Sequence, residues 1–192
     1  MDQMRTKWYV TVFLLCMASV GVAQTLGVKT NLAAPFFGSL NLGLECSVGK
    51  KYSLELYGSC RPWSRGETSV NRGWLIQPEF RYWPCQAFNG HFWGVYVLGA
   101  QFNMGGKSFP LGLLPTVKEH RYAGWTVSSG LSYGYQFMLG RHWNVETSLS
   151  VGYAYIDYRK YQCPVVCADL EKEANKHYLG PTKLAVSLIY IF

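Results

Sequence analysis

Apolar and polar residues alternate through most of the chain beyond residue 25, and this period of two constrains the fold more than any other feature. Side chains of a β-strand point alternately to opposite faces, so the alternation predicts strands. No long helical repeat competes with it. Eight such segments can be drawn: Leu26–Ala33, Leu40–Val48, Tyr52–Arg61, Trp74–Trp83, Phe92–Met104, Tyr122–Leu139, Trp143–Asp157 and Thr182–Phe192.

The connections between these segments alternate in length. Gly49 to Lys51 and Gly140 to His142 are tight turns, and Pro84 to His91 is a modest one. Longer links fall between them, at Ala34–Ser39, Pro62–Gly73, Gly105–Arg121 and Tyr158–Pro181. Outer-membrane barrels have short periplasmic turns and longer extracellular loops. The sequence therefore predicts an all-β fold, an eight-stranded antiparallel up-and-down transmembrane β-barrel.

The phase of the alternation indicates which face meets lipid. In a small membrane barrel the apolar residues face outward and the polar ones line the interior. The last segment carries Leu184, Val186, Leu188, Tyr190 and Phe192 on one face, against Lys183, Ala185 and Ser187 on the other. Aromatic residues form 16% of the chain and gather at strand ends, which is typical of interfacial girdles, at Trp74, Tyr82, Trp83, Trp125, Trp143, Tyr153 and Tyr155.

The first residues have the pattern of an export signal. Arg5 and Lys7 precede an apolar run from Trp8 to Val20, and small residues follow at Gly21 and Ala23. The run is shorter than the roughly 20 residues that a membrane-spanning helix needs. A lipoprotein signal at Cys16 is disfavoured because the bulky Leu15 precedes it. We expect residues 1–23 to be a cleaved signal peptide and residues 24–192 to form the barrel, which places the protein in the outer membrane.

Charged residues recur on the polar phase of the strands. The barrel interior is expected to receive Lys29, Glu45, Glu55, Glu79, Arg81 and Glu146, and Lys183 falls on the same phase. An isolated buried charge is costly, so these groups should pair with one another. We predict an internal salt-bridge network in which Glu79 or Glu146 pairs with Arg81 or Lys29. The alternative, catalytic carboxylates, is not needed to explain these positions.

Signal cleavage would remove Cys16 and leave an odd number of the six cysteines in an oxidising compartment. Cys163 and Cys167 are close enough to form a disulfide within one loop, which we favour over a zinc site with His177 because no fourth ligand is evident. The pairing of the other three is left open: Cys46, Cys60 and Cys85.

Motifs for other chemistry are missing. The net charge of +7 is dispersed rather than clustered, so no nucleic-acid partner is expected. No glycine pattern has nucleotide-binding spacing, and no cofactor is expected. The basic surplus suits the phosphate-rich lipopolysaccharide of the outer leaflet. His120 and His177 lack the following serine of a His-x-Ser pair, and His91 and His142 map to periplasmic turns, so a lipid-modifying enzyme remains only an alternative.

The C-terminal segment predicts a route of assembly. Tyr190 and Phe192 end a strand of alternating apolar residues, a pattern similar to the signal that the barrel-assembly machinery recognises. The last strand must also pair with the first to remove the exposed edges of the sheet. We therefore expect this machinery to be a partner of the chain and the assembled barrel to be a monomer.

Several motifs resemble one known family. They are the stretch Trp74–Trp83, the stretch Ala87–Phe92, His120–Trp125, Ser132–Tyr135 and Gly180–Lys183. Together they resemble the domain of unknown function 3575 family, Bacteroides-type small outer-membrane proteins, over nearly the whole mature chain. The resemblance implies a barrel similar to that of outer membrane protein A, with no established activity. It also implies a fimbrial or other surface protein as a partner.

These observations favour a non-enzymatic envelope protein. We expect the loops Gly105–Arg121 and Tyr158–Pro181 to contact a surface partner, or the barrel to stabilise the envelope. A narrow channel is a further alternative, although eight strands leave an interior that side chains just fill.

Overall fold

The computed structural model describes residues 25–62, 70–105, 121–161 and 170–192. Eight strands account for most of them, with one short 3-10 helix after the first. The strands are β1 (Leu26–Asn31), β2 (Leu40–Ser47), β3 (Tyr52–Arg61), β4 (Val70–Tyr82), β5 (Gly90–Gly105), β6 (Arg121–Met138), β7 (Trp143–Tyr161) and β8 (Leu170–Ile191). The helix η1 spans Ala34–Phe37.

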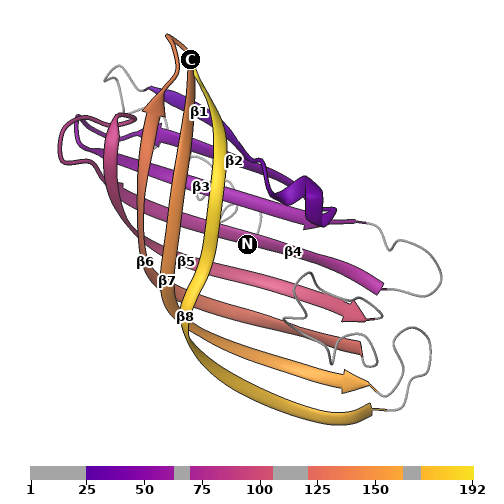
Figure 1. Cartoon of the computed structure of the whole chain (residues 1–192). Coiled ribbons are helices and arrows are strands. Elements are labelled where there is room, and N and C mark those ends of the chain that lie inside the picture. The colour runs from indigo at the N-terminus through magenta and orange to yellow at the C-terminus, as the bar shows by residue number, and fades with distance from the viewer. Residues whose placement is uncertain (1–24, 63–69, 106–120, 162–169) are drawn as a thin grey trace, which may run out of the picture.

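The strands form one closed ring in sequence order (Figure 1). Each strand is antiparallel to its neighbours, and β8 returns to pair with β1 from Gly27↔Ile191 to Asn31↔Ser187. The connections β2–β3, β4–β5 and β6–β7 therefore lie at one end of the ring, which we call the turn end. β1, β3, β5 and β7 run toward the opposite end, which we call the long-link end. The expected antiparallel up-and-down order of eight strands is confirmed.

Polarity in this ring is reversed relative to a soluble protein. The outward face exposes leucine, valine, phenylalanine and tryptophan side chains from all eight strands, including Leu44, Leu56, Val95, Leu131 and Leu184. The inward face buries polar side chains, among them Lys29, Glu45, Gln77, Arg81 and Glu146. The alternation read from the sequence thus has the expected phase, with apolar residues outside and polar residues inside.

The expected link Tyr158–Pro181 is wrong for most of its length. β7 continues to Tyr161, β8 already begins at Leu170, and the two pair from Arg159↔Glu173 to Val151↔Pro181. Described side chains from Glu173 to Leu179 are mostly exposed on both faces, since this hairpin extends beyond the ring. A strand with two hydrated faces shows no apolar–polar alternation. Gly180 and Pro181 also suggest the end of a strand, because both residues are unusual inside one.

Other boundaries differ by fewer residues. β3 spans the expected Tyr52–Arg61, whereas β4 begins at Val70 inside the link expected at Pro62–Gly73. β1 ends at Asn31 because the chain turns into η1, where Gly38 has a φ of 71° and closes the turn. Among the residues that the structure describes, no helix is long and apolar enough to cross a membrane. The expected signal peptide, residues 1–23, lies outside the described residues.

Candidate functional site

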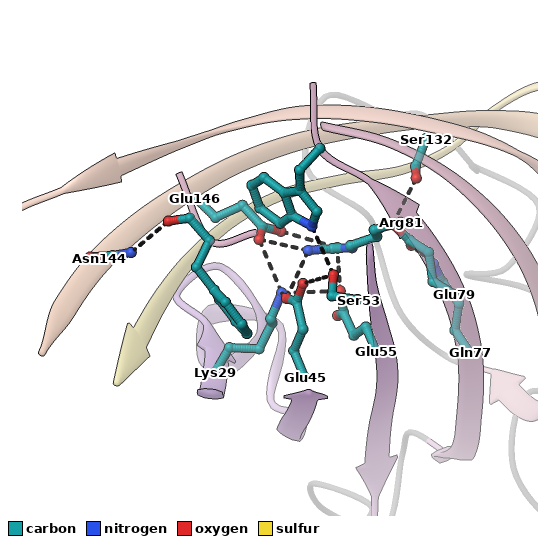
Figure 2. A network of polar contacts seen from close by, with 12 residues as sticks. Lys29, Glu45, Ser53, Glu55, Gln77, Glu79, Arg81, Ser132, Asn144 and Glu146 are labelled. Carbon is teal, nitrogen blue, oxygen red and sulfur yellow. Dashed lines mark hydrogen bonds and ion pairs between the residues drawn. The ribbon is translucent and has the colours of Figure 1, made fainter. Parts of the chain in front are cut away.

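Six charged side chains meet inside the ring near its turn end (Figure 2). They come from five strands: Lys29 on β1, Glu45 on β2, Glu55 on β3, Glu79 and Arg81 on β4, and Glu146 on β7. All six residues are at most 3% exposed. The ring thus brings together all six residues that the sequence analysis assigned to the interior, and we call them the ion cluster.

Lys29 lies between three carboxylates of the ion cluster. Its Nζ is 2.6 Å from Glu45 Oε2, 3.0 Å from Glu55 Oε2 and 3.0 Å from Glu146 Oε2. An ammonium group has three N–H donors, so Lys29 uses its whole donor capacity here. Gly43 makes this position available, because a Cβ there would overlap the Lys29 side chain.

Arg81 contacts all four glutamates of the ion cluster. Its Nη1 is 3.0 Å from Glu45 Oε2 and 2.8 Å from Glu146 Oε2, its Nε is 2.8 Å from Glu79 Oε1, and its Nη2 contacts Glu55. The guanidinium plane also stacks over Phe92, with 4.1 Å from Cζ to the ring centroid. A guanidinium presents five donors in a rigid plane, so Arg81 can join carboxylates from four strands where lysine could not.

Neutral side chains complete the hydrogen bonding of the carboxylates. Ser53 Oγ donates to Glu45 Oε1 at 2.5 Å, and Trp83 Nε1 donates to Ser53 Oγ at 2.8 Å. Ser132 Oγ donates to Glu79 Oε1 at 2.7 Å, and Gln77 Nε2 to Glu79 Oε2 at 2.9 Å. The sequence analysis missed these four residues as members of the site. Its placement of Trp83 in an outward aromatic girdle is wrong, because the Trp83 side chain is fully buried in the interior. The inward phase of the four side chains was a usable signal, because Gln77, Glu79 and Arg81 alternate along β4 with apolar neighbours.

We expect Ser132→Ala to lower the free energy of unfolding by about 1.5–3 kcal/mol, the usual worth of a hydrogen bond to a charged group. The hydroxyl is buried and Glu79 has no solvent to replace it. The measurement is a urea titration of the protein in detergent micelles. Ser129→Ala, on the exposed outward face of the same strand, is the matched control and should stay within about 0.5 kcal/mol of wild type. Equal midpoints for both variants would contradict this role of Ser132.

Aromatic side chains close the interior at the turn end. Trp83, Phe88 and Phe92 are at most 4% exposed, and Trp83 lies 6.1 Å from Phe88 and 4.9 Å from Phe92 between ring centroids. Phe88 belongs to the β4–β5 turn and adopts a positive φ of 67°, which folds its side chain inward. Asn144 Nδ2 holds that turn by donating to the Phe88 carbonyl oxygen at 3.2 Å.

A cavity of about 220 Å³, lined by both polar and apolar side chains, lies at the long-link side of the cluster. Lys183 lines it, with its Nζ 4.3 Å from the centroid of the Tyr57 ring. Gln77 lines it too, and its buried Oε1 accepts no hydrogen bond from the described residues. Lys183 thus shares the interior with the ion cluster, although its Nζ lies more than 4.0 Å from every carboxylate oxygen of the cluster.

This arrangement holds strands together. Every carboxylate of the ion cluster is ion-paired with a buried cation, and each lies in the closed interior. The ion cluster therefore links five strands by electrostatic attraction. In the described part of the chain, no group of three or more His, Cys, Asp and Glu side chains is arranged to hold a metal ion.

The described histidines contact tyrosines or the main chain. His91 Nδ1 is 2.6 Å from Tyr133 Oη, His142 Nδ1 is 2.9 Å from the Ile191 carbonyl oxygen, and His177 contacts the Tyr153 hydroxyl. His120 lies outside the described residues. Over the ranges that the structure covers, no histidine hydrogen-bonds to a serine side chain, which is the pair that the alternative of a lipid-modifying enzyme would use.

Three cysteines lie within the described residues. Cys46, Cys60 and Cys85 are free thiols. Cys163 and Cys167, the expected loop disulfide, lie outside the described residues.

Tyr190 packs against Trp143 with 5.0 Å between ring centroids, and the Phe192 N–H donates to the Leu26 carbonyl oxygen at 3.0 Å.

The fold and site together define a class of protein: a closed ring of eight antiparallel strands, ion-paired inside and apolar outside. The chain belongs to the family described as proteins of unknown function, DUF3575, which it matches over residues 9–192. The resemblance noted from its motifs is confirmed. No curated protein matches the chain. Because the family has no assigned function, the function has to be argued from the geometry.

Proposed function

We propose that the protein is a non-enzymatic β-barrel of the bacterial outer membrane that stabilises the envelope and presents a surface for interaction outside the cell. The reversed polarity of the ring carries this proposal. An outward face rich in leucine, valine and phenylalanine is unfavourable in water and favourable in lipid, and each strand is hydrogen-bonded to a neighbour on both sides around the ring.

Two groups of outward aromatic residues support a membrane position. At the turn end Tyr52 lies 5.5 Å from Tyr82, and Trp143 lies 5.0 Å from Tyr190, between ring centroids. Toward the long-link end Trp125 lies 5.5 Å from Tyr155. Tryptophan and tyrosine favour the two interfaces of a bilayer. The turn end then faces the periplasm and the long-link end the exterior, as in known outer-membrane barrels.

The filled interior supports a structural role over conduction. The ion cluster occupies the middle of the ring near the turn end, and Trp83, Phe88 and Phe92 lie beneath it. Ions would have to displace buried, fully paired side chains to pass. We therefore propose a closed barrel and keep the narrow channel as the alternative that a planar-bilayer recording would reveal.

The β7–β8 hairpin supports the surface role. β8 pairs with β1 only through Ser187–Ile191, so its residues 170–185 have β7 as their one strand partner in the described part of the chain. Figure 1 shows this part of β8 as the outermost strand. A free strand edge presents backbone N–H and C=O groups to which an extended segment of another protein can pair. A surface or fimbrial protein is the proposed partner.

Fractionation tests the proposal. We expect the mature protein to begin at Gln24 and to remain with the outer membrane through a urea wash, because the export pattern and the apolar outer face both call for it. The measurements are intact mass and density-gradient separation of the two membranes. A pool that keeps Met1 and stays in the cytosolic fraction would overturn the location. Lipid A mass spectra that change on deletion of the gene would favour the enzyme.

Assembly follows from the same proposal. Tyr190 and Phe192 end the strand that closes the ring, and we propose that the barrel-assembly machinery contacts this strand before β8 pairs with β1. The pairing of β8 with β1 through Ser187–Ile191 joins the first and last strands of the sheet without a second copy of the chain, so we propose that the assembled barrel is a monomer.

A further inference from the structure

The outward surface changes character at the long-link end of β4, β5 and β6. Along β4 the outward side chains run from Ile76 through Trp74 to Arg72. On β6 they run from Val127 through Trp125 to Arg121. Both strands thus pass from an aliphatic residue to a tryptophan to an arginine, which is the order expected where a lipid tail region ends and headgroups begin.

Asn103 of β5 lies between these two arginines. Arg72 is its Cα partner across the β4–β5 ladder, and Arg121 Nε donates to Asn103 Oδ1 at 2.8 Å. The Arg121 guanidinium also lies over the Tyr161 ring, 5.5 Å from its centroid. Within the described ranges, no carboxylate comes within 4.0 Å of either guanidinium. Two cationic side chains therefore lie on one patch with no acidic partner among the described residues, and Asn103 orients one of them, Arg121.

A hollow of about 460 Å³ opens on this patch. Arg72, Trp74, Gln101, Asn103 and Ala123 line it, and the small side chain of Ala123 leaves the space open. Trp74 Nε1 donates to Gln101 Oε1 at 3.1 Å, which orients the indole at one wall. The hollow is thus a preformed recess whose walls are largely apolar and to which Arg72, Gln101 and Asn103 contribute polar groups.

An apolar groove of about 570 Å³ continues from this hollow across β2, β3 and β4. The two share Cys60 and Trp74 as lining residues. Gly58 lines the groove, and its lack of a side chain deepens it between β2 and β4. Leucine and isoleucine residues also line it: Leu40, Leu42, Leu44, Leu56, Leu75 and Ile76. The occupant that fits both parts has a long apolar chain and an anionic head.

We propose that this surface is a specific site for a phosphate-bearing membrane lipid. Its phosphate binds between Arg72 and Arg121, and one acyl chain lies in the groove along Gly58. Guanidinium groups bind phosphate oxygens through paired, charge-assisted hydrogen bonds, and the groove excludes water from the chain. The inference rests on the proposed membrane location and adds the lipid class that the exterior end of the barrel selects.

The test is native mass spectrometry of the folded protein in mild detergent. The probes are dioleoyl phosphatidylglycerol, dioleoylglycerol, which has the same chains without the phosphate, and inorganic phosphate. We expect wild type to retain phosphatidylglycerol, and the double variant Arg72→Ala, Arg121→Ala to bind it about tenfold or more weakly. Gly58→Phe, which fills the groove but keeps both arginines, should also weaken retention.

The matched control is Lys51→Ala, Arg141→Ala, which removes two exposed cationic side chains from the turn end. It should retain phosphatidylglycerol as wild type does. Equal retention by the arginine variant, or equal binding of dioleoylglycerol, would overturn the phosphate site. Full competition by inorganic phosphate with no effect of Gly58→Phe would reduce it to an ion site and overturn the lipid. Heat-modifiable migration on gels verifies that each variant is folded. The proposed membrane location is tested separately, by the fractionation experiment.

Discussion

Arg81→Ala is expected to lower the free energy of unfolding by at least about 3–5 kcal/mol, the usual cost of removing one partner from a buried ion pair. Arg81 contacts all four glutamates of the ion cluster, and without it only Lys29 remains in contact with Glu45, Glu55 and Glu146. Glu79 would lose its cationic contact within the cluster. The uncompensated carboxylates then repel one another in a region from which water is excluded. The measurement is a urea titration of protein refolded into lipid vesicles.

Two further variants keep this expectation falsifiable. Arg81→Lys retains the charge but not the planar donors, so its loss of stability should lie between those of wild type and Arg81→Ala. Arg159→Ala breaks the ion pair with Glu173, whose side chains are 60% and 58% exposed, and should change stability by less than about 1 kcal/mol. If Arg81→Ala unfolds at the urea midpoint of Arg159→Ala, the ion cluster does not hold the ring together.

Leu131→Arg is expected to destabilise the protein by about 2–4 kcal/mol in vesicles, the cost of an arginine on the lipid face at the middle of a bilayer. Leu131 is 64% exposed and pairs with Val95 on β5 and Val151 on β7, which are themselves outward and apolar. On the surface of a water-soluble protein the same change would be nearly neutral. The change in the free energy of unfolding caused by Leu131→Arg therefore distinguishes a side chain that faces lipid from one that faces water.

Leu139→Arg is the matched control. Leu139 is 66% exposed, but it lies in the β6–β7 connection at the turn end, beyond the last residue of β6. We expect its change in stability to stay within about 0.5 kcal/mol. Equal, small effects of both substitutions in vesicles would argue that Leu131 faces water, and the proposed membrane position would then be wrong.

The strand pattern of the ring itself could be predicted from the sequence. β3 spans the predicted Tyr52–Arg61. Its successive side chains alternate between the polar interior and the apolar outer face, and this alternation is visible in the sequence. The part of the β7–β8 hairpin beyond the ring could not be predicted from such alternation. Its residues from Glu173 to Leu179 have two exposed faces, so nothing in their order distinguishes them from a loop.

The members of the ion cluster were predictable, but their contacts were not. Alternation alone assigns Lys29, Glu55 and Glu146 to one side of the sheet. It says nothing of which strands lie opposite one another across the interior. Lys29 and Glu146 are 117 residues apart, and Ser132 and Glu79 are 53 apart, yet each pair is within hydrogen-bond distance.

The sequence by itself determined the order of the strands, the face that the charged and aliphatic side chains of the ring take and the family to which the chain belongs, because these depend on local period and local motifs. Only the tertiary structure decided that Arg81 joins four glutamates, that Phe88 folds in to close the turn end, and that Arg72 and Arg121 both lie beside Asn103. The physical reason is closure. Register and curvature of a closed ring are properties of all eight strands together, and they set every contact across its interior and along its outer face.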